Sequence, residues 1–218
     1  MGVAAVAAWL ALLAAAAMAV RRRWNGEGSE GQREWSRKLV HIGSGAVVLI
    51  AWIFAIDRRI AIPAAATITL LAALNHRLRV LPAVEDVGRA SYGTVAYGAS
   101  ITLLLWQFWP GQPATVAAGV LVMALGDGLA GLVGPLWPSA SWQVLGQRRS
   151  LLGTATMAAA SLLVLAGLSL AVGGPTWPQL LAIAAAATLL EQLAVGGIDN
   201  LSVPLGVAWL WQQCSGIG

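Results

Sequence analysis

One aspartate, Asp127, lies inside the apolar, glycine-rich run ALGDGLAGLVG, which covers residues 124–134. An ionisable side chain within a membrane-spanning stretch is costly and is therefore a functional-site hypothesis by default. Gly126 and Gly128 flank it, and glycines let a backbone unwind or let a helix or ligand approach closely. The alternative is that these glycines serve helix packing and that Asp127 is a capping or buried, paired acid.

Basic side chains gather in REWSRKLVHIGSG, residues 33–45. In a helix, Arg37, Lys38 and His41 lie within one turn. Cations at a membrane edge can hold phosphate groups, but Arg37 and Lys38 would also serve as plain topological anchors. His41 lies one turn further into the apolar stretch, so anchoring explains it poorly, although a hydrogen-bonded core histidine is an alternative.

A third segment, GQRRSLLGT, covers residues 146–154 at the start of a predicted span. Backbone amides at a helix N-terminus, a guanidinium and a hydroxyl together form a natural phosphate seat. The GxxxxGK[ST] spacing of a Walker motif is absent, so the segment has low specificity on its own. Its candidate phosphate contacts are Arg148, Arg149, Ser150 and Gly153.

A fourth segment, EQLAVGGIDNLSVPL, covers residues 191–205 and carries Glu191, Asp199 and Asn200 around Gly196–Gly197. We expect the two glycines to break the helix, and Pro204 to kink or open the span that follows. Oxygen-bearing side chains beside such a break suit a hard cation, because magnesium takes one or two carboxylates together with substrate phosphates. Helix capping by Asp199 is the alternative.

The elements that must position these residues are apolar helices. Hydrophobic residues make up 58% of the 218-residue chain and charged residues 10%, against about 25% charged in soluble proteins. We therefore predict an all-α, polytopic membrane bundle of about eight transmembrane helices, with seven possible, in a single membrane domain of residues 1–218. We expect residues 1–20 to hold a retained first span, because the arginines follow the apolar run, whereas in a signal peptide the charge precedes it.

The predicted spans are 3–20, 39–56, 60–74, 91–109, 114–134, 151–172, 178–195 and 200–213, of which the third and last are short for a full crossing. Several tryptophans fall near predicted span ends, where interfacial aromatics are expected: Trp106, Trp109, Trp137, Trp142, Trp177, Trp209 and Trp211.

Basic residues are concentrated on one side of these spans. Segments 21–38, 75–90 and 135–150 hold eleven of them, whereas the opposite side holds only Arg58 and Arg59. We predict that the rich side is cytoplasmic and that both termini lie opposite. The candidate site residues belong to this side, which favours an enzyme that draws a charged reactant from the cytoplasm. A transporter would place polar groups near the midplane. Because no basic–aromatic pattern of a nucleic-acid module is present, no nucleic-acid partner is expected.

Carboxylates, cations and glycine breaks on one face indicate nucleotide–magnesium chemistry next to the lipid. Phosphoryl transfer needs positive charge and metal around the transferred group, and a base near the acceptor hydroxyl. The base is either His41 or Asp127, and the sequence does not separate them. The metal candidates are Asp127, Glu191, Asp199 and Asn200.

The four segments jointly resemble the phytol kinase group of the diacylglycerol/polyprenol kinase family. RKLVHIGSG is similar to the family's RKLVH opening, GDGLAGLVG to its GDxxAxxxG block, RRSLLGTATM to its KSxxGS segment, and E…DNLSVPL to its closing E…DNLxVP. The motifs occur in matching order and define residues 37–205 as the catalytic family region.

The resemblance implies a membrane kinase that phosphorylates a lipid alcohol, commonly with CTP in place of ATP. Asp127 would be the central acid of a nucleotide–metal site. By the same resemblance, Arg37, Lys38 and His41 would form the entry motif, Arg149 and Ser150 the phosphate-contacting segment, and Asp199 and Asn200 the last motif. Arg149 stands where relatives commonly carry lysine, which keeps the charge but replaces a point charge with a planar fork.

We therefore expect transfer of the γ-phosphate of CTP, with Mg²⁺, to an isoprenoid alcohol such as phytol, which enters from the bilayer and gives phytyl phosphate and CDP. The alternatives are a CTP-dependent diacylglycerol kinase, a CDP-lipid cytidylyltransferase and, outside enzymes, a lipid or small-molecule transporter. The expected nucleotide or phosphate contacts are Arg37, Lys38, Gly126, Gly128, Arg148, Arg149, Ser150 and Gly153.

Overall fold

The computed structural model describes residues 1–23, 30–78 and 92–216, and helices dominate this part of the chain. The predicted all-α class is confirmed. The helices are α1 (Gly2–Arg23), α2 (Glu30–Ile53), α3 (Arg58–Leu78), α5 (Gly93–Phe108), α6 (Pro113–Leu121), α7 (Gly128–Val133), α8 (Leu151–Val172), α9 (Trp177–Leu193) and α10 (Asp199–Ser215). The predicted edges agree with these bounds to within a few residues except at the start of α2, which begins nine residues before the predicted residue 39.

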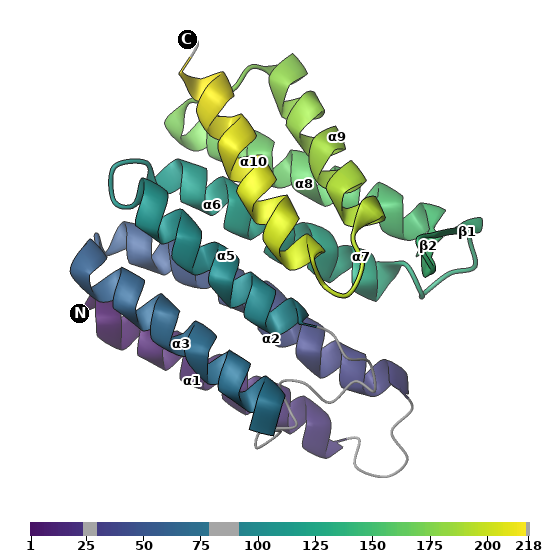
Figure 1. Ribbon diagram of the computed structural model, residues 1–218, viewed down its shortest axis with the longest axis horizontal. Coiled ribbons are helices and arrows are strands. Elements are labelled where there is room, and N and C mark those ends of the chain that lie inside the picture. The colour runs from purple at the N-terminus through teal and green to yellow at the C-terminus, as the bar shows by residue number, and fades with distance from the viewer. Residues whose placement is uncertain (24–29, 79–91, 217–218) are drawn as a thin grey trace.

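Three consecutive segments, α6, η1 and α7, form the central helix of the bundle. The middle segment, η1 (Val122–Asp127), is π-helical, whereas α6 and α7 are α-helical. This central helix contacts α2, α8 and α10, while α1 packs on α2 and α3 packs on α5 (Figure 1). The residues at 116–118, 120 and 122–124 are almost completely buried and form the middle of the hydrophobic core.

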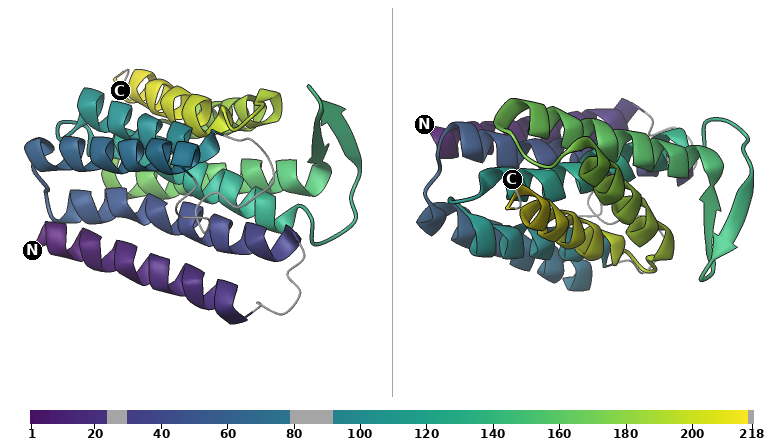
Figure 2. Two further views of the ribbon diagram at one scale, coloured as in Figure 1. Left: turned by 60° about the horizontal axis from the view of Figure 1, so that its bottom comes forward. Right: turned by 90° about the horizontal axis from the view of Figure 1, so that it is seen from above.

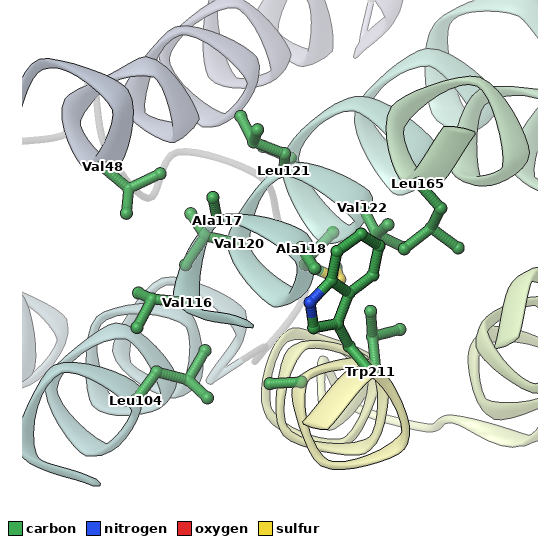
Figure 3. Packing of buried hydrophobic residues seen from close by; sticks show 14 of the residues in the cluster. Val48, Leu104, Val116, Ala117, Ala118, Val120, Leu121, Val122, Leu165 and Trp211 are labelled. Atoms are coloured by element: carbon green, nitrogen blue, oxygen red, sulfur yellow. The ribbon is translucent and has the colours of Figure 1, made fainter. Parts of the chain in front are cut away.

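The core also contains two of the tryptophans that were predicted to lie at the membrane interface. Trp211 is 2% exposed and packs against the central helix (Figure 3). Trp109 is 3% exposed, and its indole Nε1 donates a hydrogen bond to the Ile56 carbonyl at 2.8 Å. The prediction was wrong for these two because closeness to a span end does not say whether a side chain faces lipid or protein.

Four helical stretches in the described residues are long and apolar enough to cross a membrane: 2–20, 35–53, 113–133 and 151–172. These stretches indicate a membrane protein. The helices α5, α9 and α10 have only 16 or 17 residues, below the usual length of about 20 for a spanning helix. The helix α3 has 21 residues but is not among the four stretches. Four of the eight predicted spans therefore meet the criterion of length and hydropathy, and the number eight stays a prediction.

A β-hairpin that the sequence did not predict lies between α7 and α8. Its strands are β1 (Ser141–Val144) and β2 (Gln147–Ser150), which pair antiparallel. The turn residues Leu145 and Gly146 have φ of 48° and 78°, and positive φ at both central residues suits a two-residue hairpin. The usual Asn-Gly or Asp-Gly signal is missing here, so the sequence does not indicate a hairpin.

The two ends of the bundle differ. The start of α1 and the end of α10 lie at one end, and the hairpin lies at the other (Figure 2). The starts of α2 and α8 lie at the hairpin end as well (Figure 2). The candidate site residues from α2, β2 and the start of α8 therefore share one end of the molecule.

Candidate active site

Asp127 ends the π-helical segment and forms an ion pair with Lys38 of α2. The Lys38 Nζ atom lies 2.7 Å from Asp127 Oδ2 and also donates to the Asp127 backbone carbonyl at 3.1 Å. The two side chains are only 6% and 16% exposed. Opposite charges that are this close and this well shielded from water interact strongly, so the acid that the sequence singled out is paired.

His41 lies one helical turn after Lys38 and also faces Asp127, so Lys38, Asp127 and His41 form a cluster. Its Nε2 atom lies 3.5 Å from Asp127 Oδ2 and 3.4 Å from the Met123 carbonyl. Both neighbours are acceptors, which favours the tautomer that carries its proton on Nε2. Within the described residues, no hydrogen bond reaches the second oxygen of Asp127, Oδ1. Arg37 adds positive charge close enough to act on both His41 and Asp127.

The π-helical winding and the glycines bring the neighbouring helices close to Asp127. A Cβ at Gly128 would lie 2.3 Å from Ile42 Cγ1 of α2, and one at Gly126 would lie 2.6 Å from Met157 Sδ of α8. Both glycines are therefore packing positions, as the alternative interpretation held. Their predicted contact with a nucleotide stays a prediction.

Arg149 of β2 is bound to the C-terminal end of α9. Its Nη1 atom forms an ion pair with Glu191, and Nη2 donates to the carbonyls of Glu191 at 2.6 Å and Ala194 at 3.0 Å. Gln192 donates to the other Glu191 carboxylate oxygen at 2.8 Å. Sequence reasoning assigned Arg149 to phosphate and Glu191 to metal, and it missed that they are partners.

The other residues that were predicted to contact phosphate, Ser150, Gly153 and Arg148, have different surroundings. The Ser150 hydroxyl caps α8 by accepting a hydrogen bond from the Gly153 amide at 3.1 Å. A hydroxyl in this role satisfies one of the free amides at the start of a helix. Arg148 is exposed and donates to Ser141 Oγ across the hairpin at 3.4 Å, so the structure does not bring it to Asp127. Contacts of these residues with phosphate stay predictions.

The predicted helix break lies between α9 and α10. Gly196 and Gly197 have φ of 65° and 88°, a region that favours glycine, and α10 begins at Asp199. Asn200 donates to Asp199 Oδ1 through its backbone amide at 3.0 Å and its side chain at 3.2 Å. The break was predicted correctly. Pro204 does not open the last helix, because α10 continues through it, and a kink at Pro204 stays a prediction.

Asp199 completes a group of interacting acids. Asp127, Glu191 and Asp199 are close enough to influence one another electrostatically. Burial raises the pKa of the Asp199 carboxyl above its usual value, and the negative charge of Asp127 raises it further. Asp127 and Glu191 already have cationic partners, Lys38 and Arg149, so Asp199 is the acid of this group that a bound cation would stabilise most.

The donor set fits a magnesium ion that is held mainly by its substrate. In the described residues, no three His, Cys, Asp or Glu side chains form a metal-binding group. The Asn200 Oδ1 atom, however, is buried without a hydrogen-bond partner in the described structure, next to Asp199. Magnesium needs only one or two carboxylates when nucleotide phosphates supply other ligands. Glu191 fits least well, because both of its carboxylate oxygens already have donors.

Sequence reasoning missed two further neighbours of the cluster. The ring of Tyr97 in α5 lies 4.5 Å from the His41 ring, and Gly131 lies under the Lys38 side chain. Tyr97 stands in a largely apolar helix without a motif, and no sequence signal pointed to it. Gly131 belongs to the glycine-rich segment 124–134 around Asp127, but the spacing of glycines in a sequence does not show which side chain packs against each of them.

The fold and the site together define a helical membrane protein with a buried cluster of acids and cations at one end of the bundle. Comparison with curated proteins gives the family. The chain is 46% identical over 183 residues to a phytol kinase from Synechocystis, covering 81% of this chain and 78% of the relative. It is 28% identical over 197 residues to a probable chloroplastic phytol kinase 1 from Glycine max, covering 80% of this chain and 65% of the relative.

The chain belongs to the phytol kinase family. It is a kinase, a phosphotransferase with an alcohol acceptor. No family model matches the chain. No solved structure matches it either.

Proposed function

We propose that the protein transfers the γ-phosphate of CTP to an isoprenoid alcohol, with phytol as the preferred acceptor, to give phytyl phosphate and CDP. The observation that carries this proposal is the buried Lys38–Asp127–His41 cluster in a chain 46% identical to a phytol kinase. The choice of CTP rests on the family resemblance of the four motifs.

In the proposed mechanism, Asp127 accepts the proton of the alcohol through Oδ1. This oxygen is free of hydrogen bonds from the described residues, whereas Oδ2 faces both Lys38 and His41. His41 serves poorly as the base through Nε2, because that nitrogen already faces two acceptors. Its role is to hold the Asp127 carboxylate in place.

Lys38 and Arg37 supply positive charge as negative charge develops on the transferred group. Asp199 and Asn200 would hold Mg²⁺ together with the nucleotide phosphates, because both oxygens of Asp127 have other roles in this mechanism. Bound Mg²⁺ neutralises the nucleotide phosphates during transfer. Arg149 fixes the end of α9 beside this site through its contacts with Glu191 and Ala194.

We also propose that eight helices cross the membrane and that the site lies on the cytoplasmic side with both termini opposite. The placement of the chain ends away from the hairpin (Figure 2) supports this topology, as does the excess of arginine and lysine near the site. The hydrophobic tail of the alcohol then stays in the bilayer while its hydroxyl reaches the cluster.

The test is phosphate transfer by the purified protein in detergent with Mg²⁺, CTP or ATP, and phytol, farnesol or diacylglycerol. We expect phytyl phosphate from CTP and none from the Asp127→Asn variant. Asp57→Asn is the matched control, because Asp57 lies before α3, outside the cluster, and caps a local turn by accepting from the Arg59 amide at 2.7 Å.

Each other outcome points to one alternative. Phosphatidate from diacylglycerol would make the protein a diacylglycerol kinase with the same site. A CDP-lipid product would identify a cytidylyltransferase. Full turnover by Asp127→Asn would contradict the assignment of the base.

A further inference from the structure

The hydroxyl group of Tyr97 is a buried polar group that the proposed mechanism does not use. Tyr97 is 7% exposed, and its hydroxyl has no hydrogen-bond partner in the described structure. A buried hydroxyl without a partner costs about 1–3 kcal/mol, and such groups are uncommon enough in proteins to need an explanation. Phenylalanine would fill the same space without that cost.

This hydroxyl lies where α2, α5 and the central helix meet. The Tyr97 ring packs on the His41 ring with centroids 4.5 Å apart and the planes tilted by 39°. A Cβ on Gly45 would lie 2.5 Å from Ala124 Cβ and 3.7 Å from the Tyr97 hydroxyl, so the hydroxyl borders the close contact between α2 and η1.

The neighbouring groups do not satisfy this hydroxyl. Ser44 lies near it without forming a hydrogen bond of acceptable geometry, and the Ser44 hydroxyl donates to the His41 carbonyl at 2.8 Å. Tyr97 belongs to the buried hydrophobic core, which also includes Val48 and Leu121. A ligand that suits this place is a small polar group on an apolar chain.

We infer that Tyr97 is a substrate-binding residue whose phenol hydroxyl hydrogen-bonds the hydroxyl group of a long-chain, apolar alcohol next to His41. A phenol both donates and accepts, and so does the alcohol hydroxyl. The inference rests on the proposed function and adds a contact that selects for a free hydroxyl on the acceptor.

The test compares Tyr97→Phe with the wild type, using phytol and CTP as varied substrates. The substitution keeps the ring against His41 and removes only the orphaned hydroxyl. We expect the KM for phytol to rise about tenfold, as for one lost hydrogen bond, with the KM for CTP unchanged. The unfolding temperature without substrate should stay equal or rise.

The matched control is Thr102→Val, which also removes a hydroxyl from α5. Thr102 pairs with Thr69 of α3 at 3.1 Å, away from His41. We expect this variant to keep the wild-type KM for phytol. A Tyr97→Phe variant with an unchanged KM for phytol, or with both KM values raised equally, would overturn the inference.

A second measurement separates this inference from the proposed function. Phytol alone, without nucleotide, should raise the unfolding temperature of the wild type and raise that of Tyr97→Phe less. An equal shift in both proteins would overturn the role of Tyr97 even if transfer is observed. Absence of transfer by the wild type, with the difference in shift retained, would instead remove the proposed reaction and leave the binding contact.

Discussion

The end of the Lys38 side chain packs directly against Gly131 where it meets Asp127. The absence of a side chain at Gly131 therefore determines the geometry of the ion pair. A Cβ at Gly131 would lie 2.5 Å from Lys38 Cε and 2.7 Å from Nζ. These atoms are the flexible end of a side chain, so the helices need not move. The ammonium group would be displaced instead.

We therefore expect Gly131→Ala to lower kcat/KM about tenfold or more, a change of about 1.4 kcal/mol in transition-state stabilisation, with little change in the unfolding temperature. The control is Gly167→Ala in α8, where a Cβ would meet nothing within 4 Å. That variant should keep full activity and gain a few tenths to about 1 kcal/mol of stability. Wild-type activity in Gly131→Ala would show that Lys38 can reach Asp127 by another path.

The Lys38–Asp127 pair should also be important for stability, because removing one partner leaves the other charge buried. We expect Lys38→Met to destabilise the protein by about 3–5 kcal/mol, measured by denaturant or thermal unfolding in detergent. The double variant Lys38→Met/Asp127→Asn should recover part of that loss while staying inactive. Additive losses in the double variant would mean that the two side chains are not coupled.

At the scale of the elements, the Arg149 side chain joins the hairpin to the end of α9. Its three acceptors are the Glu191 carboxylate and the carbonyls of Glu191 and Ala194. The fork of a guanidinium can reach all three, whereas an ammonium on a shorter stem would be a single point charge. The hairpin and the break before α10 are thereby held together.

We expect Arg149→Gln to lower both the unfolding temperature and kcat, because the freed Glu191 would be left as a partly buried, unpaired charge. The neighbouring variant Arg148→Gln is the matched control, since Arg148 is exposed and its side chain hydrogen-bonds only Ser141 among the described residues. Its stability should stay within about 0.5 kcal/mol of the wild type. Similar effects from both variants would assign the loss to net charge rather than to the specific contact.

The sequence predicted the parts of this site that depend on local patterns. Apolar stretches identified the helices, and a charge inside such a stretch identified Asp127. The spacing of Lys38 and His41 placed them on one helical face, where both do meet Asp127. The glycine pair predicted the break before α10.

Other parts depend on contacts between distant segments and could not be predicted in this way. The pairing of Arg149 with Glu191 joins residues 42 positions apart, and Tyr97 meets His41 from a different helix. The π-helical winding of η1 lies where α2 and α8 pack against the glycines around Asp127, and no local propensity predicts it. Such winding is often found at functional sites.

At the scale of the whole molecule, the interacting acids predict how stability depends on pH and magnesium. The pKa of Asp199 is raised in the folded protein, so the folded state binds this proton more tightly than the unfolded state. Stability is therefore lost as pH rises from the usual value of the carboxyl through the raised one. Above that interval the charged Asp199 opposes folding, and a bound cation should offset it.

We expect Mg²⁺ to raise the unfolding temperature more at pH 8 than at pH 4.5, as measured by thermal unfolding at constant ionic strength. The variant Asp199→Asn should lose most of this pH-dependent difference, and Asp57→Asn should retain it. An equal effect of Mg²⁺ at both pH values, or the same effect from Na⁺, would contradict a specific role for these acids.

The hairpin turn at Leu145–Gly146 also makes the orientation of the protein accessible to experiment. It projects from the bundle at the end opposite the start of α1 (Figure 2), and both turn residues are exposed. A protease recognition sequence inserted there leaves the helices and the strand pairing intact. In sealed vesicles of known polarity, we expect cutting only by protease on the cytoplasmic side, and reaction of an N-terminal epitope only from the other side. A single protein would thus show on which side of the membrane each end of the bundle lies. Cutting by protease on the outer side would mean that the proposed orientation is the wrong way round.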